Sequence, residues 1–255
     1  MNRSYLTLAA TLALISGSHA SVLIDNFESY NSVGDDMEGK GTWHVTNNSP
    51  NVPVILDNYT WDTSTRSATV GGEAPTTNAL TSLYNTSTVP FVSPTPQPTY
   101  FQIETAYTES TGGDPRNNFQ IVLNSGVNNL LTIRLEPAGA GQYLASWDSS
   151  YVAGGFTAFG LLTANISTQF RLDTWWNGSA VAYNLTNAND PVSSGVLAGA
   201  TGAEIIDTIA VQWDTSNGVG GNSITIDNVS VVPEPTSALL GLLGSSFVFL
   251  RRRRA

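Results

Sequence analysis

The sequence predicts an all-β protein, a single antiparallel β-sandwich set between two terminal targeting segments. Between residues 21 and 232, apolar and β-branched residues come in short runs separated by Gly, Asn, Ser and Pro, which is typical of strands joined by turns. Helical periodicity is hard to find there, and many short runs at this spacing favour a sandwich over an α/β fold. About 210 residues suffice for one large β domain.

The first half of this region contains four predicted strands and one long loop. The strands cover residues 21–24, 42–45, 52–56 and 68–70. Residues 85–99 carry four prolines among Ser and Thr, and we expect an extended loop there. Strand patterns of one style continue on both sides of it, so the loop is placed within a single domain; a division into two domains is the alternative.

The second half shows clearer alternation of large and polar residues. The dipeptide Asn177-Gly178 lies between two such runs, and Asn-Gly is the strongest short-range hairpin signal because both residues tolerate positive φ. The predicted strands are residues 100–107, 119–123, 130–135, 143–147, 169–176, 180–185, 205–213 and 223–232.

Three of these runs carry a resemblance to a known family of folds. Residues 170–183 (Phe-Arg-Leu-Asp-Thr-Trp-Trp-Asn-Gly-Ser-Ala-Val-Ala-Tyr), 209–213 and 224–231 resemble concanavalin A-like jelly rolls, and are equally similar to laminin-G-like domains and carbohydrate-binding modules. The resemblance implies a jelly-roll sandwich whose first strand, here leading into Asp25, often lies beside the last.

Charge and cysteine content exclude several classes of function. The chain has a formal net charge of −10, and all but one of its 20 acidic residues lie between Asp25 and Asp227. Such a surface repels phosphate backbones, so nucleic acid is excluded as a partner. The chain contains no cysteine, and therefore has no disulfide, thiol nucleophile or cysteine metal ligand.

The N-terminus has the pattern of a secretory signal. Arg3 supplies a positive start, residues 5–15 are mostly apolar, and Ser18-His19-Ala20 places small residues around a cleavage site. We expect cleavage between Ala20 and Ser21, so residues 1–20 form the signal peptide and residues 21–232 the sandwich. An uncleaved membrane anchor is disfavoured because its apolar core is too short.

The C-terminus combines three features in residues 233–255. Pro233, Glu234 and Pro235 keep the backbone extended; residues 238–250 are uncharged and mostly apolar, and as a helix would span roughly 20 Å, short of a bilayer core of about 30 Å. Four arginines, Arg251, Arg252, Arg253 and Arg254, follow and should stay on the cytoplasmic side as a membrane stop.

This ending resembles the PEP-CTERM sorting signal of exported proteins of Gram-negative bacteria. The resemblance implies a short transmembrane helix, an inner-membrane intermediate, and processing near Pro233-Glu234-Pro235 by an exosortase-type enzyme. The domain would then reach the cell surface or the extracellular polysaccharide matrix. An ordinary tail anchor is the alternative.

Catalytic patterns are not found in the sequence. Some jelly-roll glycosidases use an E-x-D-x-x-E type run, which is missing here, and Glu204 and Asp207 fall on opposite faces of a strand. His44 is the only histidine after residue 20, and no nucleophile elbow or zinc repeat surrounds it. We therefore expect a non-enzymatic protein, with a jelly-roll glycoside hydrolase or lyase as the least favoured hypothesis.

The acidic composition permits calcium, which binds carboxylate and carbonyl oxygens. The candidate ligands are Asp25, Glu28 and Asp227, whose strands are neighbours if the first strand lies beside the last. Such a site would tie the two ends of the domain together. The alternative is that these are turn-forming or solvated acids.

Aromatic residues are the other candidate binding groups, since exposed rings stack on sugars. Trp175 and Trp176 must point to opposite sides of one strand, so one of them can be exposed. Tyr151, Phe156 and Phe159 lie in a Gly-rich stretch. For any single ring, core packing is the alternative. Two main hypotheses follow: a surface or matrix component associated with exopolysaccharide, and a calcium-dependent carbohydrate-binding module.

Overall fold

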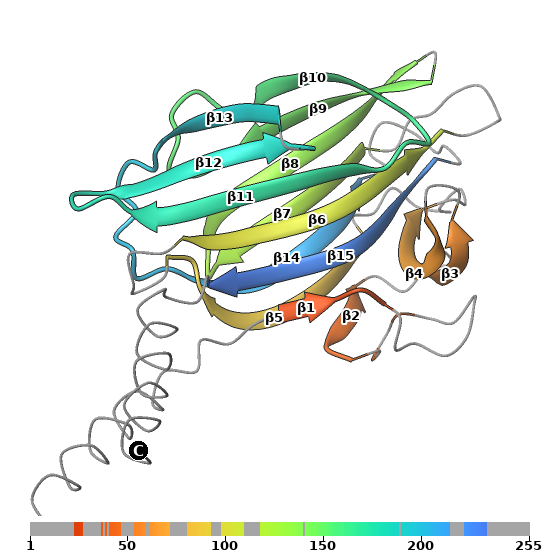
Figure 1. Ribbon diagram of the computed structural model, residues 1–255, viewed down its shortest axis with the longest axis horizontal. Coiled ribbons are helices and arrows are strands. Elements are labelled where there is room, and N and C mark those ends of the chain that lie inside the picture. Colours follow the sequence, from red (N-terminus) through yellow and green to blue (C-terminus); the bar gives the residue numbers. More distant parts are fainter. Residues whose placement is uncertain are drawn as a thin grey trace, which may run out of the picture.

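The protein is an all-β jelly-roll sandwich, as predicted. The computed structural model describes residues 23–27, 37, 39, 41–46, 54–59, 62–71, 81–92, 98–109, 118–139, 141–188, 190–214 and 222–233. Within these residues fifteen strands form two antiparallel sheets that face each other (Figure 1). No helix in the described part is long and apolar enough to cross a membrane.

The eight-stranded sheet, called sheet A here, has the order β13-β12-β11-β6-β15-β4-β3, and β1 pairs with β15 beside it. Several neighbouring strands in this sheet, such as β6 and β15, come from distant parts of the chain. Its strands are β1 (Leu23–Asp25), β3 (Val54–Tyr59), β4 (Asp62–Gly71), β6 (Thr99–Thr108), β11 (Thr168–Trp176), β12 (Val181–Asn187), β13 (Asp190–Val196) and β15 (Ser223–Pro233).

The seven-stranded sheet, called sheet B, has the order β10-β9-β8-β7-β14-β5-β2. Its strands are β2 (Trp43–Thr46), β5 (Thr81–Pro90), β7 (Asn118–Ser125), β8 (Asn128–Gly139), β9 (Gln142–Asp148), β10 (Thr157–Thr163) and β14 (Ile205–Asp214).

The first and last strands are neighbours, which confirms the expectation drawn from the jelly-roll resemblance. Leu23 lies opposite Val231 and Asp25 opposite Val229. At its beginning, from Ser223 to Ile226, β15 pairs with β4 instead. The last residue of β15, Pro233, lies opposite Thr99, so the predicted sorting motif begins where the sandwich ends.

The core is built from the inward half of each strand. Side chains of β6 and β11 alternate between buried and half-buried positions, because successive residues of a strand point to opposite faces. Aromatic pairs join the two sheets: the ring centroids of Tyr107 and Tyr143 lie 5.0 Å apart, and those of Trp147 and Tyr183 lie 5.5 Å apart. The outward half of each strand is left for solvent or a ligand.

Most predicted strands are present. The errors concern the proline-containing stretch over 85–99 and the outermost strands of the two sheets. The loop expected over 85–99 is wrong in its first part, because residues 85–90 belong to β5, a strand that was not predicted. Strands β10 and β13 were not predicted. They form the outermost strands of sheets B and A, where both faces are largely exposed, so neither strand needs the apolar alternation that a half-buried strand shows.

The Asn177-Gly178 hairpin joins β11 and β12 as expected, but its loop is longer than the two-residue turn that this dipeptide favours. Trp176 pairs with Val181, which leaves residues 177–180 in the loop. The Asn177 side-chain Oδ1 accepts bonds from the backbone N–H groups of Ser179 and Ala180, both at 3.0 Å. Gly178 adopts a positive φ of 101°, and a backbone bond from the Asn177 N–H to the Ala180 carbonyl, at 3.0 Å, closes the loop together with the side-chain cap.

The predicted processing sites lie almost entirely outside the described residues. This applies to the signal cleavage site at Ala20 and Ser21, and to Glu234 and Pro235 of the sorting motif. It also applies to the apolar segment 238–250 and to the arginines of the membrane stop, Arg251, Arg252, Arg253 and Arg254.

Candidate functional site

Strand β11 directs three functional side chains to the outward face of sheet A. Arg171, Asp173 and Trp175 stand two residues apart along the strand, so all three share one face. The intervening Leu172 and Thr174 are buried. The alternation that fills the core thus places a cation, a carboxylate and an indole in one line on the surface.

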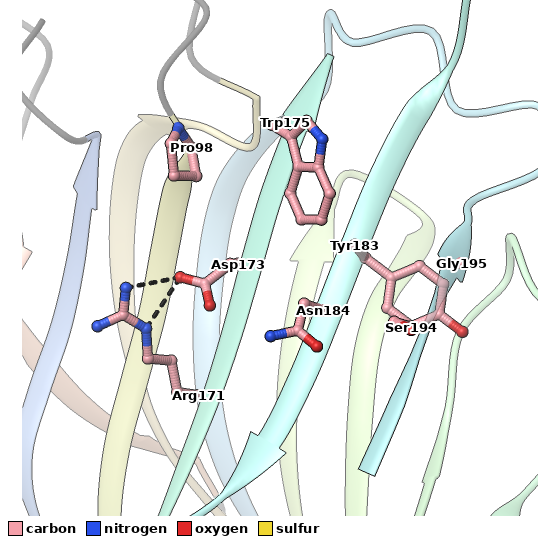
Figure 2. Close-up of a pocket in the computed structure, with 8 residues that line it drawn as sticks. All are labelled: Pro98, Arg171, Asp173, Trp175, Tyr183, Asn184, Ser194 and Gly195. Carbon is pink, nitrogen blue, oxygen red and sulfur yellow. Dashed lines mark hydrogen bonds and ion pairs between the residues drawn. The ribbon is translucent and has the colours of Figure 1, made fainter. Parts of the chain in front are cut away.

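These side chains line a pocket of about 700 Å³ on that face. Figure 2 shows the Trp175 ring above the middle of the pocket, with Asp173 to one side of it and Asn184 below it. Sites of this kind combine an aromatic wall with a few polar groups that fix the orientation of a ligand. The lining residues are Pro98, Arg171, Asp173, Trp175, Tyr183, Asn184, Ser194 and Gly195.

A polar row crosses four strands through this pocket. Tyr100 on β6 lies opposite Asp173 on β11, Asp173 lies opposite Asn184 on β12, and Asn184 lies opposite Ser194 on β13. Three inter-strand spacings of about 4.8 Å make the row roughly 14 Å long. This length accommodates more than one sugar ring lying across the strands.

The positive charge in the pocket is paired with a carboxylate and covered on one face. The Arg171 guanidinium donates from Nε and Nη2 to Asp173 Oδ1, at 2.9 and 2.7 Å. The same group lies over the Tyr100 ring, 4.4 Å from its centroid, a cation–π arrangement. These contacts hold the Arg171 side chain in place against the pocket, with its charge balanced by Asp173.

Other polar groups of the row have no protein partner in the part of the chain that the structure describes. Asp173 takes both arginine bonds through Oδ1, which leaves Oδ2 without one. The Asn184 amide and the Ser194 hydroxyl make no hydrogen bond to any described residue, and their polar atoms are not among the buried unsatisfied ones. They are accessible donors and acceptors.

The two predicted sugar-binding tryptophans separate in the structure. Trp175 lines the pocket, whereas Trp176 is 43% exposed at the end of β11 and packs beside Gly202. A Cβ at Gly202, where φ is +80°, would lie 3.4 Å from Cε3 of the Trp176 ring. Trp176 therefore packs against the loop that contains Gly202, outside the pocket, and Trp175 is the candidate ligand contact.

The loop that packs on Trp176 is fastened by a carboxylate. Glu204 Oε1 accepts from the Thr201 N–H at 2.8 Å and from the Thr201 hydroxyl at 3.1 Å, and Oε2 accepts from the Gly202 N–H at 2.8 Å. Burial by itself would raise the pKa of Glu204, but these bonds favour the charged form and lower its pKa below the usual value.

The predicted calcium ligands fall into two groups. Asp25 and Asp227 lie on adjacent strands, Asp25 being opposite Val229, while Glu28 lies outside the described residues. Asp25 Oδ1 accepts from the Phe27 N–H at 2.8 Å and Oδ2 from Trp43 Nε1 at 2.6 Å. Asp227 is fully buried. Among the described residues no three or more acidic or histidine side chains cluster as a metal site.

The other residues considered as functional candidates pack against or bond to neighbouring protein groups. His44 lies on β2 with its ring 5.5 Å from that of Tyr84, and Asp207 accepts a short bond from the Gly126 N–H. Phe159 packs edge-on against Phe170 of the core, at 5.5 Å. Phe156 is 40% exposed, and its ring lies beneath the guanidinium of Arg134, which is on β8 of sheet B.

Sequence inspection missed Asn184, Ser194 and the role of Asp173. Residues 171, 173 and 175 could have been grouped from strand alternation alone. Asn184 and Ser194 carry no comparable signal, because each enters the site only through its cross-strand register.

Comparison with known proteins supports the fold and nothing finer. No protein-family model matches this chain, and no curated protein sequence does. Solved structures do match. A carbohydrate esterase from the Shiga toxin-encoding bacteriophage phi24B aligns with a TM-score of 0.54 and 11% identity, covering 78% of this chain and 95% of its own. At such low identity the likeness concerns architecture.

Two further structures illustrate the range of proteins that share the architecture. The endo-β-1,4-glucuronan lyase of the fungus Trichoderma reesei has a TM-score of 0.51 and 10% identity over 85% of this chain and 96% of its own. The carbohydrate recognition domain of Emp47p has a TM-score of 0.50 and 10% identity over 86% and 97%. The neighbours thus include enzymes and lectins.

Proposed function

We propose that this protein is an exported glycan-binding β-sandwich whose binding site is the pocket on the outward face of sheet A. The observation that carries the proposal is the combination of Trp175 with the row of Asp173, Asn184 and Ser194. An indole offers an apolar surface for the C–H face of a sugar ring, while carboxylate, amide and hydroxyl groups can bond its hydroxyls.

The arrangement suits an extended polymer better than a single sugar. The row runs across four strands of a continuous sheet surface, so successive sugars could lie over successive strands. The carbohydrate recognition domain found among the structural neighbours makes this function compatible with the fold, which also hosts enzymes. The proposal takes the site to be a binding site without chemistry of its own.

The proposal is tested by native affinity electrophoresis of the full-length protein in gels containing different polysaccharides. We expect retardation by at least one polymer and its loss in Trp175→Ala. Trp176→Ala is the matched control, because it removes the same side chain from the neighbouring position outside the pocket. Equal retardation of wild type and Trp175→Ala, or no retardation by any polymer, would overturn the assignment of this pocket.

We also propose that residues 233–255 sort the protein through the inner membrane to the cell surface or matrix. The support is the sequence of the tail, together with the position of Pro233 as the last residue of β15, which sets the motif directly after the sandwich. The intact mass of the native protein reports cleavage at both ends. A mature protein that retains residues 238–254 would contradict the proposal.

A structural calcium ion bound by Asp25, Glu28 and Asp227 is a further proposal. Its support is the adjacency of β1 and β15, which brings the strand of Asp25 beside that of Asp227, together with the preference of calcium for carboxylate oxygens. Chelation with EDTA should lower the melting temperature of the wild type and leave Asp227→Asn unaffected. An unchanged wild-type melting curve in EDTA would exclude a stabilising metal ion.

A further inference from the structure

We infer that the pocket selects uncharged glycans and rejects polyuronates and other polyanionic sugars. This inference rests on the glycan-binding function proposed above and names its ligand class. The argument begins with the cation: a site for acidic sugars needs a positive charge free to meet a carboxylate, and a guanidinium is the usual choice because it bonds carboxylates in a bidentate manner.

Among the residues that the structure describes, the one cation that lines the pocket is already bonded to a carboxylate of the protein. Arg171 contributes both Nε and Nη2 to Asp173, and its face is covered on one side by Tyr100. A sugar carboxylate that approached the Nε–Nη2 edge of the guanidinium would have to displace Asp173, which follows two residues later on the same strand. Displacement would leave the Asp173 carboxylate, whose side chain is 17% exposed, without its counter-charge.

The surroundings repel anions as well. The chain carries a net charge of −10, so a polyanion approaches against the field of the whole protein. In the part of the chain whose side chains the structure describes, the other arginine, Arg134, is likewise paired, with Glu136 at 3.0 Å. No compensating basic patch is therefore found among these residues.

The groups that remain accessible suit hydroxyls. Asp173 Oδ2 is an acceptor, Asn184 offers an acceptor and two donors, and the Ser194 hydroxyl does both. Neighbouring hydroxyls of a sugar ring can donate to the carboxylate and accept from the amide. A carboxylate-bearing sugar would bring a second anion beside Asp173 Oδ2, where like charges repel.

The experiment compares polymers and then reverses the selectivity. In native affinity electrophoresis the full-length protein should be retarded by neutral polymers, such as hydroxyethyl cellulose or galactomannan, and should pass polygalacturonate and alginate gels unretarded. In Asp173→Asn the guanidinium loses the counter-charge of Asp173, and we expect about tenfold stronger retention by polygalacturonate, comparable to one charge-assisted hydrogen bond. This gain should vanish at raised ionic strength.

Glu136→Gln is the matched control, because it makes the same change in net charge beside the other paired arginine and should not alter retention. A wild type that binds polygalacturonate as well as neutral polymers, and loses both in Trp175→Ala, would overturn the selectivity while leaving the proposed function intact. Equal polyuronate retention by Asp173→Asn and Glu136→Gln would also overturn it. Failure to bind any polymer would instead overturn the proposed function.

If Asp173→Asn does not fold, as judged by its melting curve, Arg171→Gln provides a second test. It removes the cation and leaves Asp173, so polyuronates should be rejected by this variant as they are by wild type. Retention by polygalacturonate that wild type shows and a folded Arg171→Gln protein lacks would show that the guanidinium holds acidic sugars, contrary to the inference.

Discussion

The outward faces of the two sheets carry the same local motif, and on sheet A a pocket lined by tryptophan lies beside it. Residues 171–173 on sheet A read Arg-Leu-Asp, and residues 134–136 on sheet B read Arg-Leu-Glu. In both, the leucine is buried and the arginine pairs with the acid, at 2.7 and 3.0 Å. In both, the guanidinium lies over an aromatic ring, Tyr100 at 4.4 Å and Phe156 at 4.1 Å.

The difference lies in the cross-strand neighbours. Asp173 faces the Asn184 amide on one side and Tyr100 on the other, whereas Glu136 faces Leu144. Four residues beyond each arginine, sheet A has Trp175 and sheet B has Ala138. An Arg–acid pair on a strand is therefore a local consequence of alternation, and the residues beside it decide whether it becomes part of a binding site.

The two faces share one core, and removing a core contact should affect both. Trp147→Ala removes an indole that is 3% exposed and packs against Tyr183 between the sheets. We expect a loss of about 3–5 kcal/mol in the free energy of unfolding, measured by urea denaturation. Trp176→Ala, at an exposed position, is the control; comparable losses would mean that the inter-sheet contact is not important for stability.

Moving the tryptophan to the other face tests whether the ring or its neighbourhood makes the site. Ala138→Trp, combined with Trp175→Ala, places an indole four residues after the sheet B arginine. We expect glycan retardation to remain at least about tenfold weaker than in wild type, because Leu144 offers no hydrogen bond there. Restored retardation would show that an exposed ring suffices.

The amide neighbour can be tested singly. Asn184→Ala removes a pocket donor and acceptor, and we expect about a tenfold loss of affinity for the retained polymer, near 1.4 kcal/mol, measured by isothermal titration calorimetry. Leu144→Ala, at the matching position on sheet B, should leave the affinity unchanged. An equal effect of both substitutions would argue against a direct contact with Asn184.

Acid should weaken the loop beside Trp176, which the Glu204 carboxylate fastens. Because the pKa of Glu204 is lowered in the folded protein, its contribution to stability is complete above its ordinary value of 4.5 and is lost as the pH falls through the folded pKa. The melting temperature of Glu204→Gln should therefore fall less than that of wild type in this range. Parallel pH curves would exclude a role for this carboxylate.

The sequence by itself determined the strand content and the class of fold. Residues 100–107 and 169–176 alternate large and polar side chains because one face must be buried, and that requirement is visible in the chain. The same alternation was enough to group the outward residues of β11, although sequence inspection did not do so. Strands β10 and β13 escaped detection because edge strands bury little on either face and need no such pattern.

Only the tertiary structure decided what those outward residues form. Two nearly identical triplets, at 134–136 and 171–173, have the same local geometry, yet Asp173 meets Asn184 and Ser194 through the register of β12 and β13. Register depends on how whole strands pack and on the length of the loops that join them, and no single segment encodes it. The chain specifies each strand locally, while the binding site arises from the pairing of strands.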